Sequence, residues 1–142
     1  MKKILTLVVL ITALAACSSD SYVNRNPYLN TGSFSCTIDI TLPSNNDLRF
    51  TANPVVIRTA GYGINGLIVM NTGSGYVAWE NTCPNQEITS CSILTLNGAY
   101  VTCPCDDVKY SLFTGQPTTP MKFNLKAYRI EILSSTAIRV YN

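Results

Sequence analysis

The stretch that decides the fold covers residues 83–115 and reads CPNQEITSCSILTLNGAYVTCPCDDVKYSLFTG. It carries four cysteines in two groups, Cys83 with Cys91 and Cys103 with Cys105. Strand-forming residues lie between the groups on both sides of Asn97-Gly98. This dipeptide between two strand-like runs is the strongest short-range signal for a β-hairpin. The sequence therefore predicts two cysteine-bearing loops separated by one hairpin.

Outward from this stretch, the chain keeps the pattern of short β-strands. Apolar residues occupy every second position from Phe34 to Leu42, a period typical of a half-buried strand. A run over 48–57 is interrupted by Pro54, and Trp79 lies in an apolar run that we assign to the core. Further strands are expected at 67–70, 76–80, 93–96, 99–102, 128–133 and 137–141. With no useful helical period after the first segment, the pattern predicts an all-β sandwich or small barrel.

The two cysteine segments also resemble a known family. They read Cys83-Pro84-Asn85 and Cys103-Pro104-Cys105-Asp106, and Tyr110 and a Thr114-Gly115 turn follow. This resembles the Rieske [2Fe–2S] family, whose pattern is Cys-x-His, a spacer, Cys-Pro-Cys-His-Gly-Ser, an aromatic residue and a Thr-Gly turn. The resemblance covers residues 67–142 and implies a Rieske-like antiparallel β structure with two cysteine-bearing loops at one end.

The chain departs from this family at the cluster ligands. The resemblance places the ligand positions at Cys83, Asn85, Cys103 and Asp106, so an amide and a carboxylate replace the two histidines. The chain contains no histidine at all. The Gly-Ser that follows the second histidine in the family is Asp107-Val108 here. A normal Rieske centre is therefore excluded at these ligands, and we expect neither a metal nor another cofactor.

The resemblance also implies what the four loop cysteines do. In some subfamilies the middle cysteine of the second segment forms a disulfide with the first segment, which implies Cys105 with Cys91. Cys83 and Cys103, which would grip one iron in the family, are then close enough to form a second disulfide. The other pairing, Cys83–Cys105 with Cys91–Cys103, stays open.

Two redox functions remain as alternatives. The four thiolates could ligate an ordinary [2Fe–2S] cluster for electron transfer, since Cys₄ ligation is the commoner type. Cys103-Pro104-Cys105 could act in thiol–disulfide exchange, although Asp106 and Asp107 disfavour a reactive thiolate there. Cys36 is left over, and we interpret it as a buried thiol of a strand.

The first residues predict export and a lipid anchor. Lys2 and Lys3 precede an apolar run of about 11 residues, which has the length of a signal peptide and is too short to span a bilayer. The run ends in Leu14-Ala15-Ala16-Cys17, which resembles a bacterial lipobox with Cys17 as the acylated residue. We therefore divide the chain into a signal peptide (1–16), a lipid-anchored flexible tether (17–32) and a β domain (33–142). Ser18 favours the outer membrane over the inner one.

Composition limits the functions further. Without Lys2 and Lys3, eight of the ten basic residues remain against eight acidic ones, and a chain of zero net charge is a poor partner for nucleic acid. The absence of histidine excludes Ser-His and Cys-His catalysis and speaks against an enzyme. The sequence thus favours a structural or interaction module of the cell envelope, whose partner would be an unidentified envelope protein or glycan.

Overall fold

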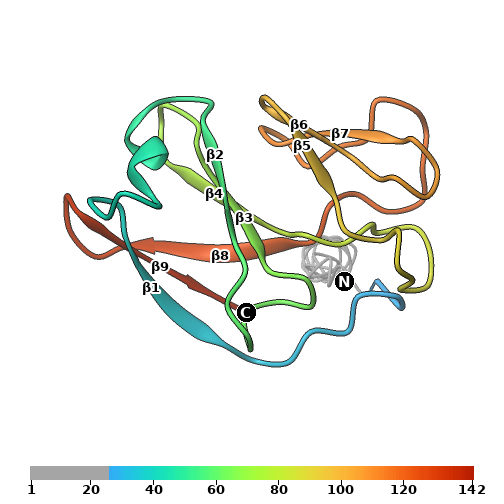
Figure 1. Ribbon diagram of the computed structural model, residues 1–142, viewed down its shortest axis with the longest axis horizontal. Coiled ribbons are helices and arrows are strands. Elements are labelled where there is room, and N and C mark those ends of the chain that lie inside the picture. Colours follow the sequence, from blue (N-terminus) through green and yellow to red (C-terminus); the bar gives the residue numbers. More distant parts are fainter. Residues whose placement is uncertain (1–25) are drawn as a thin grey trace, which may run out of the picture.

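A computed structural model describes residues 26–142, which form two antiparallel β-sheets (Figure 1). The larger sheet has the strand order β1-β9-β8-β4-β3-β2, and the smaller has the order β5-β6-β7. The strands of the larger sheet are β1 (Ser35–Asp39), β2 (Pro54–Ile57), β3 (Leu67–Asn71), β4 (Tyr76–Glu80), β8 (Ala127–Ile132) and β9 (Ala137–Tyr141). Those of the smaller are β5 (Thr95–Asn97), β6 (Tyr100–Thr102) and β7 (Lys109–Ser111). This confirms the all-β class.

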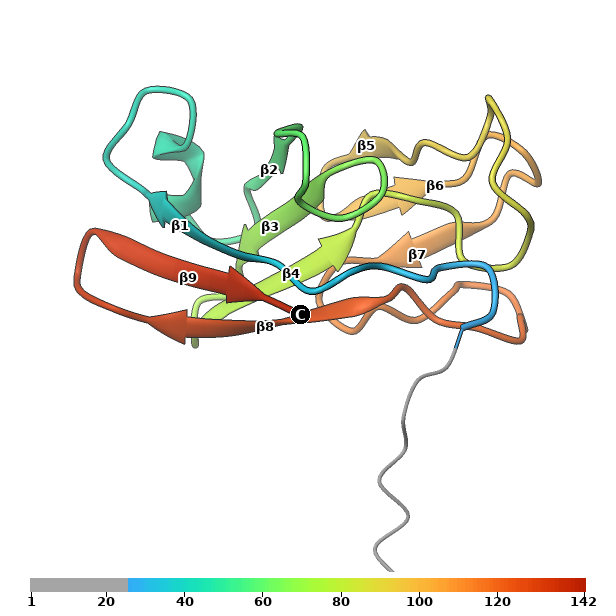
Figure 2. The same ribbon diagram turned by 90° about the horizontal axis from the view of Figure 1, so that it is seen from below.

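The larger sheet is curled rather than flat. Its two halves are joined through β4 and β8, which share only the pairs Ala78↔Tyr128 and Trp79↔Ala127. Figure 2 shows β1, β9 and β8 as one layer, with β4, β3 and β2 turning away from it. A short pairing lets the sheet bend there, so that its inner face can close over a core.

Strand β3 is buried on both faces and links two hydrophobic cores. Leu67 and Val69 point into the first core, inside the curled sheet, together with Ile38 and Val140. Ile68 and Met70 point the opposite way, into the second core under the smaller sheet. Because neighbouring side chains of a strand alternate between faces, a strand between two cores needs an unbroken apolar run. The second core contains Trp79, as expected, and also Cys83, Cys103 and Tyr110.

The predicted hairpin between the cysteine segments is present as β5 and β6. Its turn lies one residue later than the dipeptide suggested, because Asn97 pairs with Tyr100 and Gly98 begins the turn. Gly98 has φ +60°, a left-handed conformation that glycine adopts without steric cost. Strand β7 extends this hairpin, and the smaller sheet thereby holds the segment after Cys103 against the rest of the domain.

Three predicted strands differ from the observed ones by more than one residue. The strand expected over 93–96 is β5, which begins at Thr95 and ends at Asn97. The strand expected over residues 34–42 ends at Asp39, whose carboxylate accepts hydrogen bonds from the Thr41 amide and hydroxyl, and Leu42 is exposed. The run over 48–57 divides into a 3₁₀ turn, η2 (Asn46–Arg49), and strand β2. Pro54 does not interrupt this strand but begins it, at the edge of the sheet where a missing N–H is tolerated.

The N-terminal segment of the described residues packs against the domain. Residues 1–25, which include the predicted signal peptide and Cys17, lie outside the described residues. Residues 26–32, assigned to a tether from the sequence, bury Leu29, and the Asn26 side chain donates a hydrogen bond to the Pro84 carbonyl (2.6 Å). No helix within 26–142 is long and apolar enough to cross a membrane.

Candidate functional site

The two cysteine segments meet at one end of the molecule, between the two sheets. The first segment follows β4 and carries Cys83 and Cys91, and the second connects β6 to β7 and carries Cys103 and Cys105. Each segment is fixed by its own backbone. The Cys83 amide donates to the Ser92 carbonyl (2.8 Å), and the Cys103 amide donates to the Val108 carbonyl (2.9 Å).

Two disulfides join these segments. One connects Cys83 to Cys103 and the other connects Cys91 to Cys105, with Cα–Cα distances of 5.5 Å and 5.2 Å. Both distances lie in the range that an ordinary disulfide spans. This is the pairing that the family resemblance implied, and the other pairing is not the one observed.

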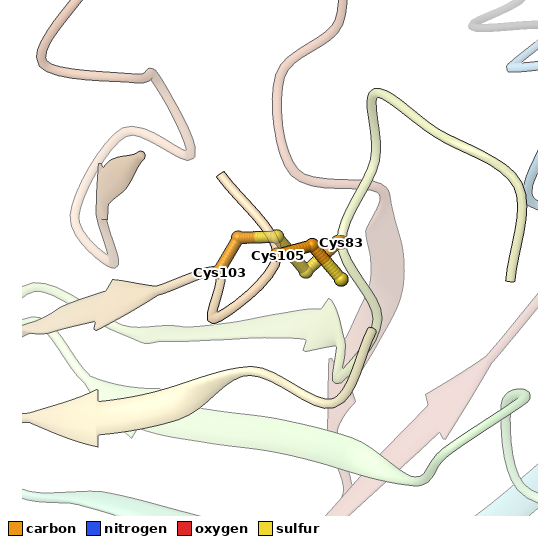
Figure 3. A group of neighbouring side chains, drawn as sticks. All are labelled: Cys83, Cys103 and Cys105. Carbon is orange, nitrogen blue, oxygen red and sulfur yellow. A yellow bond between two sulfur atoms is a disulfide. The ribbon is translucent and has the colours of Figure 1, made fainter. Parts of the chain in front are cut away.

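The two disulfides differ in burial. Cys83 and Cys103 are 1% and 0% exposed and belong to the second core. Cys91 is exposed and Cys105 is half-buried. The Thr89 hydroxyl lies 3.2 Å from the Cys91 sulfur and 3.7 Å from the Cys105 sulfur. Figure 3 shows that the side chains of Cys83, Cys103 and Cys105 gather at one point, and their sulfur atoms lie within 4.8 Å of one another.

Asn85, at the first histidine position of the family pattern, holds two distant segments together. Its Nδ2 donates to the Tyr110 hydroxyl (2.9 Å) and to the Phe123 carbonyl (2.8 Å), and its Oδ1 accepts from the Phe123 amide (2.8 Å). The amide therefore fixes a loop 38 residues away in the sequence. Burial raises the pKa of the Tyr110 hydroxyl above its usual value, the hydrogen bond from Asn85 opposes this, and the charge of Asp106 adds to it.

Asp106, at the second histidine position, shapes its own loop. Its Oδ1 accepts a hydrogen bond from the Val108 amide (3.0 Å), which closes a turn at the end of the cysteine segment. The next residue, Asp107, has φ +58° and donates its amide to the Cys103 carbonyl (2.9 Å). The family pattern has glycine there, and aspartate is one of the few other residues that tolerate this conformation. The loop thus keeps a left-handed residue at that position.

The sequence did not indicate a buried carboxylate next to the first cysteine segment. Glu80 is fully buried at the end of β4 and accepts hydrogen bonds from the amides of Ile64 (2.8 Å) and Asn65 (3.1 Å). It also accepts from the hydroxyls of Thr82 (2.6 Å) and Tyr128 (2.5 Å). Burial, followed by the charge of Glu80, raises the pKa of the Tyr128 hydroxyl. The sequence does contain one signal for this buried carboxylate, because Glu80 directly follows the apolar residues of a predicted strand.

This carboxylate explains one glycine of the segment 61–66. Gly63 has φ +69°, and a Cβ there would lie 2.5 Å from the Glu80 Oε2. The amides of the next two residues, Ile64 and Asn65, donate to the same carboxylate. Cys36, the one cysteine within residues 26–142 outside a disulfide, is a buried thiol of β1, and burial raises its pKa.

An iron–sulfur cluster does not fit these donors as the structure holds them. The sulfur atoms of Cys83 and Cys103 are bonded to each other, and those of Cys91 and Cys105 likewise, whereas a cluster requires free thiolates. At the two remaining ligand positions, the Asn85 amide is engaged at both ends and Asp106 accepts from Val108. The disulfides and Asn85 join separate segments, and Asp106 closes a turn within its own loop.

Comparison with known proteins identifies structures that share this fold. No protein-family model matches the chain, and no curated protein matches it. Solved structures do match it. The first is a chain of the complex of reduced oxygenase and oxidised ferredoxin in carbazole 1,9a-dioxygenase, at 22% identity and a TM-score of 0.50, covering 77% of this chain and 94% of that one. The chain has a Rieske-like fold.

Two further structures give lower TM-scores. The ferredoxin of carbazole 1,9a-dioxygenase from Nocardioides aromaticivorans is 19% identical, with a TM-score of 0.45 and coverage of 73% of this chain and 95% of that one. A protein described as the small subunit of an NADH-dependent nitrite reductase from Mycobacterium tuberculosis is 15% identical, with a TM-score of 0.46 and coverage of 78% and 96%. At these identities the likeness concerns the fold alone.

Proposed function

We propose that this chain is a lipid-anchored structural or interaction module of the cell envelope, built on a Rieske-like fold in which two disulfides take the place of the cluster. The observation that carries the proposal is that all four loop cysteines are consumed in disulfides that join the two loops. The missing histidines and the engaged Asn85 amide support it. Structural disulfides are typical of proteins in oxidising compartments, which agrees with export.

The proposal also includes the lipid anchor at Cys17. Acylation of Cys17 would hold the chain at a membrane, where several acyl chains give stable attachment. The first described residues enter the domain beside Pro84, whose carbonyl accepts a hydrogen bond from the Asn26 side chain (2.6 Å). A module held in this way would meet an envelope protein or glycan at the membrane surface.

The test is the native composition of the full chain, expressed with its own first segment in a bacterial host and extracted from membranes in detergent. Intact mass spectrometry without air, before and after reduction and alkylation, should show a polypeptide that begins at lipid-modified Cys17. No iron or sulfide should be bound, and the four loop cysteines should react with iodoacetamide only after reduction. The matched variant Cys17→Ser should lose both the lipid and the membrane association.

Two results would overturn the proposal. Iron and sulfide in equal amounts, with a visible absorbance that dithionite bleaches, would favour the alternative of a [2Fe–2S] electron-transfer protein with Cys83, Cys91, Cys103 and Cys105 as ligands. Loop cysteines that react with iodoacetamide before reduction would remove the disulfides on which the proposal depends.

A further inference from the structure

The two disulfides are in contact with each other, and only one of them faces solvent. The sulfur atoms of Cys83, Cys103 and Cys105 lie within 4.8 Å of one another (Figure 3). Cys105 belongs to the accessible disulfide, and Cys83 and Cys103 form the buried one. A reductant in solution therefore meets Cys91–Cys105 first, and the sulfur that this reaction frees already lies beside the second disulfide.

Thiol–disulfide exchange needs a thiolate within reach of a disulfide sulfur, and the rate depends strongly on access. Solvent thiols have poor access to Cys83–Cys103, because both residues are in the second core. The Cys105 sulfur, in contrast, lies close enough to reach the Cys83–Cys103 disulfide from inside the protein. Cys105 is also followed by residues whose backbone is fixed, since Asp107 donates to the Cys103 carbonyl (2.9 Å) and Val108 donates to Asp106 (3.0 Å). The attacking group is thus held near its target.

We propose that the two disulfides form a relay, in which reduction of Cys91–Cys105 by an external dithiol is passed through Cys105 to Cys83–Cys103. The dithiol supplies two electrons and becomes a disulfide, while Cys91 and Cys105 become thiols. The Cys105 thiol then loses its proton to solvent, and its thiolate attacks the Cys83 sulfur. The Cys83–Cys103 bond breaks, a Cys83–Cys105 bond forms, and Cys103 leaves as a thiolate that takes up a proton. A second dithiol then reduces the Cys83–Cys105 bond.

Hydroxyl groups around Cys105 favour this step. The Thr89 hydroxyl lies 3.7 Å from the Cys105 sulfur and the Ser92 hydroxyl lies 3.9 Å from it, so both can donate to a thiolate. Hydrogen bonds to a charged form stabilise that form. The carboxylates of Asp106 and Asp107 act in the opposite direction. The Asp106 Oδ1, however, accepts from the Val108 amide.

The target sulfur follows from the chain connection. Cys103 and Cys105 are separated only by Pro104, whose ring fixes φ, so a bond between them closes a short and stiff ring. Cys83 comes from the other segment and has no such restriction. The relay therefore passes through Cys83–Cys105, and Cys103 is the thiol released in the core.

The test compares two variants of the full chain, both in a Cys36→Ser background so that no other described thiol reacts. Cys91→Ser leaves Cys105 free beside the buried disulfide, and the matched control Cys105→Ser leaves Cys91 free instead. Each is treated with dithiothreitol at pH 8, quenched with acid and alkylated, and the labelled peptides are mapped by mass spectrometry. Cys83–Cys103 should open on the order of tenfold faster in Cys91→Ser, since a tethered thiolate has a high effective concentration.

A readout without variants covers the case in which one of them fails to fold. In the wild-type protein, brief reduction followed by iodoacetamide blocks Cys91 and Cys105, and Cys83–Cys103 should then open more slowly than in the unblocked protein. Equal opening rates in both comparisons would overturn the relay. The relay rests on the disulfides of the proposed function, but a failure of the relay can be distinguished from a failure of the proposed function. Equal rates with both disulfides present refute the relay alone, whereas loop thiols that are free before reduction refute the proposed function.

Discussion

At the scale of single residues, the two positions that align with the histidines of the Rieske pattern carry side chains with structural roles. Asn85 and Asp106 both use their side-chain oxygens to accept backbone amides, and Asn85 in addition donates to two oxygen atoms. Both side chains therefore fix backbone, Asn85 between distant segments and Asp106 within its own loop.

The contribution of Asn85 to stability follows from its three hydrogen bonds. Each neutral bond contributes about 0.5–1.5 kcal/mol, so Asn85→Ala should lower the free energy of unfolding by about 2–3 kcal/mol. It also leaves the Tyr110 hydroxyl and the Phe123 amide without these partners. Guanidinium unfolding measures the loss, with exposed Asn30→Ala as the control, expected within about 0.5 kcal/mol of wild type. A loss no larger than that of the control would contradict the structural role.

The sequence could indicate what is missing at these positions but not what replaces it. The absence of histidine is visible in the composition and excludes the normal ligands. The partners of Asn85, in contrast, are Tyr110 in strand β7, 25 residues away, and Phe123 in a segment without regular structure, 38 residues away. Glu80 likewise has a distant partner, since Tyr128 in strand β8 is 48 residues away. Such contacts depend on the tertiary packing, which no local pattern reports.

At the scale of elements, the strands that the sequence predicted best are those bounded by clear turn residues. The predicted runs 67–70 and 76–80 match β3 and β4 to within one residue. The strand predicted over 48–57 was wrong in its first part, because tertiary contacts hold that part as a 3₁₀ turn. Leu48 is fully buried, and its carbonyl accepts a hydrogen bond from the Asn71 side chain at the end of β3 (3.0 Å). Apolar content alone does not distinguish a buried 3₁₀ turn from a strand.

The turn after β7 packs on β4 and gives a test of this packing. Gly115 has φ +72°, and a Cβ there would lie 2.5 Å from the Trp79 ring. The ring is held in place, because its Nε1 donates to the Leu112 carbonyl (2.9 Å). Gly115→Ala should therefore lower the free energy of unfolding by about 3 kcal/mol, the sum of crowding and a left-handed alanine.

The control for this prediction separates the two costs. Gly98 has φ +60°, and a Cβ at this position would meet no other atom within 4 Å, so Gly98→Ala should cost only the left-handed conformation, about 1 kcal/mol. Thermal unfolding measures both variants. Trp79 is the only tryptophan of the chain, so its fluorescence should change in Gly115→Ala and not in Gly98→Ala. Equal losses in the two variants would mean that the ring moves aside without cost.

At the scale of the whole molecule, two cores share strand β3 and the disulfides lie at the edge of the second one. The first core is closed by the curled sheet. The second is closed by a sheet whose three strands contain only three residues each, together with the two cysteine loops. Covalent links between these loops therefore add stability beside the shortest strands of the described residues.

The two disulfides should contribute unequally, and their difference isolates the effect of burial. They join residues 20 and 14 positions apart, so their effects on the entropy of the unfolded chain are nearly equal, about 3 kcal/mol each. Replacing Cys83 and Cys103 by alanine also leaves a cavity in the second core, which adds about 1–2 kcal/mol. The exposed pair leaves less of a cavity. Guanidinium unfolding of the two double variants, Cys83→Ala with Cys103→Ala and Cys91→Ala with Cys105→Ala, measures the difference. If the exposed pair costs as much as the buried pair, the disulfides act on the unfolded chain alone, and the second core closes without the sulfur atoms.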